Sequence, residues 1–567
     1  MRNSYTLTAL VVALIALAGA AIAFNNGSTR PLKGHEIFVA ETASEMIAGR
    51  DYLVPRYNAE PRLQKPPLAY WLSIGFHRLL GNGASPVVSE LEARLPSLIS
   101  GVALLAVTFL LGLAAFGDRR IGLLAAGLLA TSSIFFTFSR NARPEMLYAL
   151  LCTVQLLGLV IAAKRDAAGR SAIPGAILAW VAVAGALLAK GPQFPIFLLA
   201  GAALALPLRA GHTRLRRVLH PALGLIAVAL VAPYYAYLVA NIDGAIALWS
   251  REVVQNTAVP LWLRPLRLYY PFSLLLAMVP WIALLGFGAV HCWKRRDPYA
   301  LMMAFPILIA VACLSFVGKL RPHYVLPLVP AAAVLIAWAT VELFDRARVD
   351  NHARWLADKL ITCQAALIVL LLAVVAAFSL QEDPVSGHPM WPTAAPWLAL
   401  AALTALAATR FGRARPAWAV GGMGASLLAV SLAISQGGLD VSRYWATAEA
   451  FARQMARTVP PDAPLAYQNV QSAALIYYGR RIGPQLQIAE WVKTHGRAHL
   501  PWLVCRGSCT YQGRELEGEV VLKQKDAGQR RILVLFKPKG AQLETRMANP
   551  APPLPRSIRN DAARTRP

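Results

Sequence analysis

Long apolar runs recur along most of this chain, and they constrain its fold more than any other feature. The first run covers residues 5–24, and the others cover about 94–116, 121–138, 146–163, 172–189, 193–208, 221–240, 270–291, 298–317, 324–342, 360–379, 393–408 and 417–436. A helix needs about 20 apolar residues to cross a bilayer. Window length therefore predicts an all-α polytopic membrane domain of about thirteen transmembrane helices within residues 1–437. We expect the first run to be a retained anchor, although its Ala18-Gly19-Ala20 could serve a cleaved signal peptide.

The charge of the chain supports a membrane location. Only 15% of the 567 residues are charged, yet the formal net charge is +27. Such an excess would suggest nucleic-acid binding in a soluble protein. Basic residues also gather in cytoplasmic loops of membrane proteins, where they set topology and contact anionic lipid. We therefore expect the membrane, and no nucleic acid, as the partner of these cations.

The basic clusters also predict the topology. They lie in alternate connections between the apolar runs, at 118–120, 164–165, 209–217, 294–296, 346–348 and 410–415. If the spans simply alternate, all of these connections face the cytoplasm. The N-terminus is then cytoplasmic, and residues 25–93 and everything after 437 lie outside.

The C-terminal region changes character. Residues 438–546 contain short apolar runs separated by turn residues, which predicts a small extracytoplasmic α/β domain. Residues 547–567 are rich in Pro and Arg and predict a disordered tail. Cys505 and Cys509 are too isolated for a zinc site, so an extracytoplasmic location favours a local disulfide between them.

Cations on the external side are informative because they should be scarce there. Lys65 belongs to the polar segment 31–72, Arg143 precedes a span, and Lys190 and Lys319 lie against spans beside Gly or Pro. Each alone could be an interfacial anchor that reaches toward the head groups. As a set they suggest phosphate binding, since a charge-assisted hydrogen bond contributes about 1.5–3 kcal/mol. We expect them to hold the head group of a polyprenyl phosphate.

Two acids and a histidine are the candidate catalytic groups. Glu36 and Glu145 could each act as a general base or an electrostatic group. Alternatively, Glu36 is a first-turn helix acid and Glu145 a partner of Arg143. His35 precedes Glu36 and is either structural or catalytic. A metal held by His35, His323 and Glu36 is conceivable, but their spacing gives no support, and we expect no required cofactor.

Several motifs in order resemble one family. The segment HEIFVAETASEMIAGRDYLVPRYNAEPRLQKPPLAYWL, the ARLPS at 93–97, the ARPEM at 142–146 and the KGP at 190–192 are its main matches. Lys319-Leu320 with Tyr324, and the stretch 465–487, extend the match. Together they are similar to the bacterial lipid A aminoarabinose transferases and, more broadly, to the protein O-mannosyltransferase superfamily of membrane glycosyltransferases.

The resemblance implies a fold, an activity and a site. The fold is about thirteen spans of the GT-C type plus an external domain. The activity is inverting transfer of a sugar from an undecaprenyl-phosphate donor to a lipid A-like lipid, a glycan or a protein, on the periplasmic face of a bacterial inner membrane, by a monomer. Phosphate-binding residues would be Lys65, Lys190, Lys319, Arg143, Arg56 and Arg62. Glu36 and Glu145 would lie near the acceptor, with Tyr70, Tyr324 and Gln64 in the substrate pocket.

The chain departs from the family pattern at three places. His35 occupies the leading acidic position, Gln64 occupies the Glu position before Lys-Pro-Pro, and the His of the long external loop has no counterpart within 251–270. The family's metal site is therefore not expected here. The base could be His35, Glu36 or Glu145, or no base is needed because the acceptor is an ionised phosphate. Two other interpretations are a catalytically inactive relative that binds lipid phosphate and a lipid or sugar transporter, although the charges lie at one face and no halves repeat.

Overall fold

The computed structural model describes most of the chain. The residues that it describes are 16, 19–20, 31–32, 34–81, 85–207, 212–250, 268–279, 281–316, 320–380, 391–412, 424–427, 429–430, 446–468, 470, 473–481, 483, 501–511, 514–525 and 532–538. Most of the predicted first span, Lys319, most of the external loop 251–270 and the predicted tail lie outside these residues.

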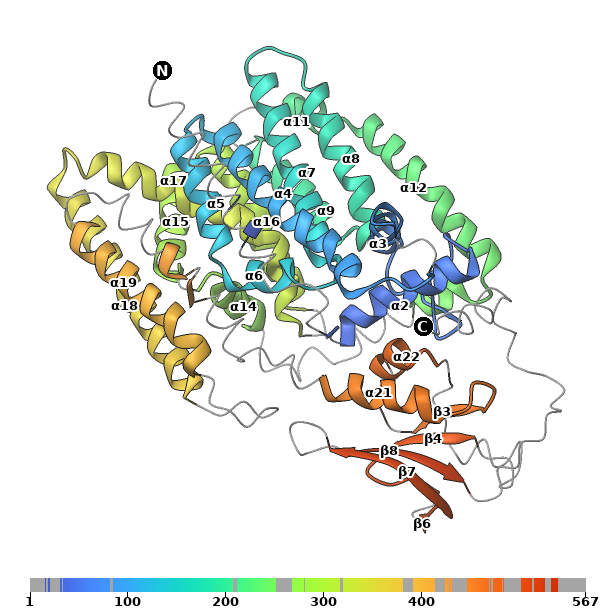
Figure 1. Ribbon diagram of the computed structural model, residues 1–567. Helices are drawn as coiled ribbons and strands as arrows, with labels where there is room; N and C mark the ends of the chain where they lie inside the picture. Colours follow the sequence, from blue (N-terminus) through green and yellow to red (C-terminus); the bar gives the residue numbers. More distant parts are fainter. Residues whose placement is uncertain are drawn as a thin grey trace.

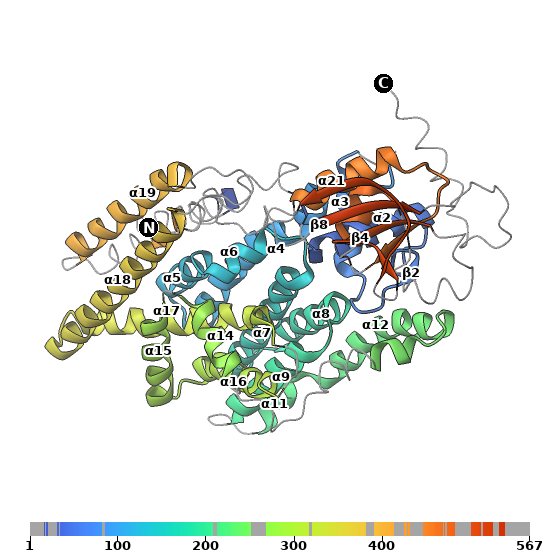
Figure 2. The same cartoon turned by 90° about the horizontal axis from the view of Figure 1, so that it is seen from below.

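A bundle of apolar helices forms the body of the molecule (Figure 1). Its helices are α4 (Glu90–Phe116), α5 (Arg119–Ala130), α6 (Ser133–Ser139), α7 (Pro144–Ala167), α8 (Ile173–Ala189), α9 (Gln193–Ala205), α11 (His212–Leu219), α12 (Pro221–Asn241), α14 (Tyr269–Ala277), α15 (Ile282–Arg295), α16 (Pro298–Leu314), η2 (Pro322–Leu328), α17 (Val329–Arg346), α18 (Asn351–Ser379) and α19 (Trp391–Gly412). The bundle core is built mainly from α4, α5, α7, α16 and α17. Helices α18 and α19 run side by side at one edge (Figures 1 and 2).

The apolar helices confirm a multi-pass membrane protein. Among the described residues, five helices are long and apolar enough to cross a membrane, or up to seven if each of two bent pairs is one span. The run predicted at 121–138 is one of these pairs, since α5 and α6 meet at 69°. Thr131 and Ser132 lie at the break, and their hydroxyls donate to carbonyls of the last turn of α5. The number of thirteen spans stays a prediction.

Ion pairs connect the basic loops at one end of the bundle. Arg120, at the start of α5, binds Asp345 near the end of α17 at 2.7 Å. Arg217 of α11 binds Asp166 at the end of α7 at 3.2 Å. Segments far apart in sequence therefore meet in space, and the alternating topology stays a prediction.

The polar segment before α4 crosses the opposite end of the bundle. It forms α2 (Gly34–Gly49), the two-stranded hairpin of β1 (Arg56–Tyr57) and β2 (Glu60–Pro61), and α3 (Leu68–Leu79). Helix α2 packs against α3 and α4. A helix that lies across the bundle in this way can present side chains to the ends of several spans.

A small α/β unit covers the outer face of α2 (Figures 1 and 2). Its sheet has the order β3 (Leu465–Gln468), β4 (Trp502–Arg506), β8 (Ile532–Pro538) and β7 (Gly518–Lys525), with β3 parallel to β4 and the other pairs antiparallel. Helices α21 (Ala446–Thr458) and α22 (Ala473–Gly479) share a buried apolar cluster with α2 and the sheet. Strands β5 (Thr510–Tyr511) and β6 (Arg514–Glu515) form a hairpin, which the Cys505–Cys509 disulfide ties to β4.

Polar contacts fasten this unit to the segment before α4. The backbone N–H of Leu32 donates to the Tyr478 hydroxyl at 2.7 Å, and the Tyr477 hydroxyl donates to the Val88 carbonyl at 2.8 Å. Arg480 also pairs with Glu41 of α2 at 3.4 Å. The C-terminal unit therefore contributes to holding α2 in place.

Candidate active site

The start of α7 supplies the central carboxylate of the site. Arg143 is the N-cap with an extended backbone, and Pro144 takes the first helical position that its ring favours. Glu145 follows in the first turn, where the helix dipole favours a negative charge. The Arg143 guanidinium donates to both of its oxygens, with Nη2 at 3.1 Å from Oε1 and Nε at 3.2 Å from Oε2. The Glu145 side chain is only 4% exposed.

Two further elements bring positive or polar groups to Glu145. Lys190, which ends α8, places Nζ at 3.5 Å from Oε1, and His323 of η2 places Nε2 at 3.6 Å from the same oxygen. The turn after Lys190 is held by Tyr148, whose hydroxyl donates to the Gly191 carbonyl at 2.8 Å. Gly191 has φ +133°, a conformation that other residues rarely adopt.

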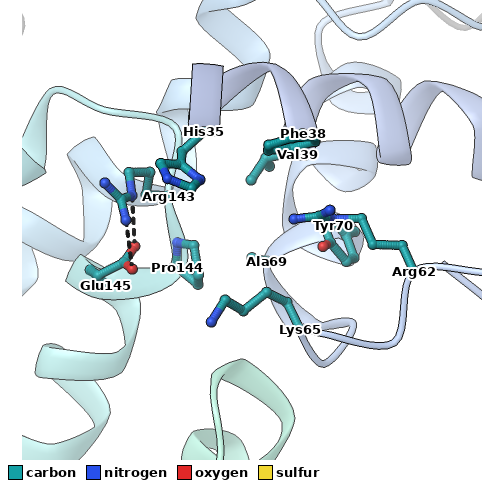
Figure 3. Close-up of a pocket in the computed structure, with 10 residues that line it drawn as sticks. All are labelled: His35, Phe38, Val39, Arg62, Lys65, Ala69, Tyr70, Arg143, Pro144 and Glu145. Atoms are coloured by element: carbon teal, nitrogen blue, oxygen red, sulfur yellow. Dashed lines mark hydrogen bonds and ion pairs between the residues drawn. The ribbon is translucent and has the colours of Figure 1, made fainter. Parts of the chain in front are cut away.

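A pocket of about 380 Å³, including its open mouth, lies beside Glu145 (Figure 3). It is lined by side chains from α2, the β2–α3 loop, α3 and the start of α7: His35, Phe38, Val39, Arg62, Lys65, Ala69, Tyr70, Arg143, Pro144 and Glu145. The Lys65 side chain reaches toward the side of the pocket where Glu145 lies (Figure 3). The Arg62 guanidinium lies 4.1 Å from the centre of the Phe38 ring, at cation–π distance.

Cations outnumber acids around this pocket. Arg62, Lys65 and Arg143 line it, Lys190 adjoins it through Glu145, and Glu145 is the one carboxylate among its described lining residues. Lys190 is 13% exposed and Arg143 is 16% exposed, so neither charge is freely screened by water. The arrangement suits an anionic ligand that brings further negative charge to these groups.

His35 faces the pocket as a neutral ring. Its side chain is exposed at the pocket opening, yet partial desolvation by the surrounding protein and the positive charges of Arg143 and Arg321 lower the pKa of His35 to about 4. The imidazole is therefore uncharged at neutral pH. It can exchange a hydrogen bond with a ligand, but it is a weak base before an anion binds.

Glu36 lies beside the site and does not line it. Its Oε1 accepts from Arg94 Nε at 3.0 Å and from the Ala142 backbone N–H at 2.9 Å. Arg94 is fully buried, and it also donates to the Pro31 carbonyl at 3.0 Å. This geometry favours a structural role for Glu36 over the catalytic role that we expected. The pair ties α2 to α4 and to the residues before Arg143.

Some of the other predicted site residues lie at the site, and others do not line the pocket. Tyr70 is buried and lines the pocket, and the Tyr324 ring lies 5.0 Å from Lys190 Nζ. Gln64 is exposed and Arg56 is half-buried, and neither is among the lining residues.

Sequence reasoning missed an aromatic residue that lines the pocket and a hydroxyl residue that supports it. Phe38 carried no separate signal within the apolar positions of its helix. Ser97, which donates to the Arg143 carbonyl at 2.8 Å, belongs to the ARLPS motif together with Arg94. That motif is therefore the signal by which the supporting residues could have been found.

The residues present do not fit the metal site considered from the sequence. Glu36 is paired with Arg94, with its Oε1 at 3.0 Å from Arg94 Nε. The described part of the chain contains no group of three His, Cys, Asp or Glu side chains that could hold a metal ion.

Comparisons with known proteins agree with the resemblance seen in the sequence. Residues 64–237 match the dolichyl-phosphate-mannose-protein mannosyltransferase family. An uncharacterised protein of Aquifex aeolicus is 27% identical over 325 residues, which are 55% of this chain and 60% of that protein. The undecaprenyl phosphate-alpha-4-amino-4-deoxy-L-arabinose arabinosyl transferase of a Pseudomonas aeruginosa strain is 25% identical over 387 residues, which are 65% of this chain and 66% of that enzyme.

Solved structures show the fold. The crystal structure of ArnT from Cupriavidus metallidurans bound to undecaprenyl phosphate superposes with a TM-score of 0.75 at 21% identity, covering 93% of this chain and 98% of that one. The archaeal oligosaccharyltransferase AglB from Archaeoglobus fulgidus, in complex with an inhibitory peptide and a dolichol-phosphate, has a TM-score of 0.51 at 12% identity, covering 89% and 69%. The predicted resemblance to aminoarabinose transferases within the protein O-mannosyltransferase superfamily is confirmed.

Proposed function

We propose that this chain, as a relative of the bacterial aminoarabinose transferases, is an inverting membrane glycosyltransferase. It moves a sugar from an undecaprenyl-phosphate-linked donor to a lipid, glycan or protein acceptor on the periplasmic face. The observation that carries this proposal is the excess of cationic side chains around Glu145, at the end of a bundle of apolar helices. A polyprenyl phosphate combines the two chemistries that such a place accommodates, an anionic head group and a hydrocarbon tail.

The transfer step follows from the charges of the pocket. An acceptor oxygen attacks the anomeric carbon on the side opposite the phosphate, and the bond between that carbon and the phosphate oxygen breaks. Its electron pair stays on the phosphate, so the leaving polyprenyl phosphate gains one negative charge. Lys65, Arg143 and Lys190 would stabilise that charge as it develops.

The proton of the acceptor determines whether a base is needed. A hydroxyl acceptor must lose its proton, and His35 or Glu145 could receive it. An ionised phosphate acceptor has no proton to lose. Glu145 is bound by Arg143, Lys190 and His323, so its first role in the structure is to hold these groups in place.

One observation favours a second candidate, an inactive relative that binds lipid phosphate. The low pKa of His35 leaves the position weakly basic. Both candidates predict binding of polyprenyl phosphate, and only the enzyme predicts turnover.

The test uses purified full-length protein in liposomes with a radiolabelled polyprenyl-phosphate sugar and envelope lipids as acceptors. Release of polyprenyl phosphate together with a labelled acceptor is the expected result. Lys65→Ala should abolish transfer while the protein still accumulates in membranes. Arg56→Ala is the matched control, because Arg56 belongs to the same segment but does not line the pocket. Unchanged turnover of Lys65→Ala would contradict the phosphate role, and binding without turnover would favour the inactive relative.

A further inference from the structure

We infer that the donor sugar carries hydroxyl groups and no ammonium group, so that this chain discriminates against the amino sugar named for its arabinosyl transferase relatives. This inference deepens the proposed function and rests on it. It comes from the acids that the pocket offers and from the cations that surround them.

The carboxylate of the pocket already forms hydrogen bonds and ion pairs with cations of the protein. Among the described lining residues only Glu145 carries a carboxylate, and both of its oxygens receive hydrogen bonds from Arg143. Oε1 is also approached by Lys190 and His323. A sugar ammonium could gain this carboxylate only by displacing cations that the protein supplies.

The remaining acids of α2 are held away from the pocket. Glu36 pairs with the fully buried Arg94, and Glu41 pairs with Arg480 of the C-terminal unit. Glu45 accepts two backbone N–H bonds from the β1–β2 turn, with oxygen to nitrogen distances of 2.5 and 3.0 Å. None of the three is among the residues that line the pocket.

Two positions where the family pattern has an acid are uncharged in this chain. His35 faces the pocket as a neutral ring, and Gln64 is exposed beside Lys65. His35 therefore offers no negative charge to an ammonium group in the pocket, whereas Gln64 is not among the residues that line it.

The cations of the pocket oppose a second positive charge. A single pair of like charges 4 Å apart disfavours binding by about fivefold, even at the dielectric constant of water. Arg62, Lys65 and Arg143 all line the pocket. We therefore expect an amino sugar to be used at least about tenfold less efficiently than its hydroxyl counterpart.

The same pocket offers contacts that suit a hydroxylated ring. Phe38 presents an aromatic face, and the Arg62 guanidinium lies against it at 4.1 Å from the ring centre. The Arg62 guanidinium lines the pocket and carries N–H donors, which a sugar hydroxyl can accept. A hydroxyl can both donate and accept here, whereas an ammonium group only donates.

The test compares donors that share one undecaprenyl-phosphate chain and one pentose. These are arabinose, 4-amino-4-deoxyarabinose and the N-formyl derivative of the amino sugar, which keeps the nitrogen but removes its charge. With full-length protein in liposomes at pH 7, kcat/KM should be at least about tenfold higher for the hydroxyl and N-formyl donors than for the free amine. An amino donor used as well as the hydroxyl donor, or better, would overturn the inference.

Two further measurements keep the inference separate from the proposed function. Arg62→Gln removes one cation and should lower the discrimination by about fivefold, while Arg56→Gln, outside the pocket, should leave it unchanged. Equal discrimination in both variants would contradict the role of the pocket charge. If no donor supports transfer, the proposed function fails. The three lipids are then compared as competitors of labelled undecaprenyl phosphate, where equal or tighter binding of the amino lipid overturns the inference by itself.

Discussion

The buried pair of Glu36 and Arg94 allows a test of whether Glu36 supports the fold or takes part in the reaction. Arg94 is fully buried and Glu36 is 1% exposed. Their charges face each other at 3.0 Å, and both side chains also hydrogen-bond to backbone, Arg94 to the Pro31 carbonyl and Glu36 to the Ala142 N–H. Removing one charge leaves the other buried without this ion pair, and breaking a buried ion pair costs about 3–5 kcal/mol.

The design uses two single variants and their combination. Glu36→Gln keeps an oxygen for the Ala142 N–H, and Arg94→Met fills most of the space of the guanidinium. Each single variant should lose about 3–5 kcal/mol of stability, and the double variant should recover most of that loss because no lone charge remains. The loss should reduce the amount of folded protein that accumulates in membranes.

The assay follows unfolding of the detergent-purified protein by tryptophan fluorescence and measures sugar transfer on the folded fraction. If Glu36 acts through Arg94, the double variant regains both stability and a substantial part of transfer. The refuting result is a Glu36→Gln protein that unfolds at the wild-type temperature but transfers no sugar, because Glu36 would then act in the reaction itself.

Three further predictions concern the supports of the pocket. Gly191→Ala should weaken transfer and cost about 1–3 kcal/mol in thermal unfolding, since φ is +133° there, and a variant as active and stable as wild type would contradict the strain. Ser97→Ala should cost about 1 kcal/mol and raise the KM for the donor more than it lowers kcat, because the hydroxyl holds the Arg143 carbonyl. Burial raises the pKa of Glu41 to about 7 despite the attraction of Arg480. The folded protein therefore binds the Glu41 proton more tightly than the unfolded chain does, and the stability gained in this way is complete below the ordinary pKa of glutamate and is lost as the pH rises through 7. Between pH 6 and 8 the loss is about 1 kcal/mol, and in Glu41→Gln this part of the pH dependence should disappear from unfolding measurements.

The charged residues of the site could be identified from the sequence. Lys65, Lys190 and Arg143 stood out because cations should be scarce on the external side of a membrane protein, and the structure brings them together around Glu145. Membrane insertion restricts where such residues can lie along the chain. Their convergence could therefore be predicted, although their roles in transfer stay predictions.

Side-chain contacts between segments far apart in the sequence could not be predicted. Nothing near Glu36 in sequence indicates that Arg94, 58 residues later, takes up its charge. Lys65 lines the pocket whereas its neighbour Gln64 is exposed, because one step along the turn reverses the direction of a side chain. Hydropathy windows also missed the break at Thr131 and Ser132, because the two helices together are as apolar as a single span.

The fastening of α2 by the C-terminal unit has a consequence for biosynthesis. The partners of Leu32 and Glu41 lie 446 and 439 positions further along the polypeptide. During translation the ribosome must add about 440 further residues before the groups that cover α2 exist. The wall of the pocket is thus synthesised early and is completed only when these distant residues have been added. Chains that stop before Tyr478 and Arg480 would carry an unfinished wall, which favours late assembly of the site.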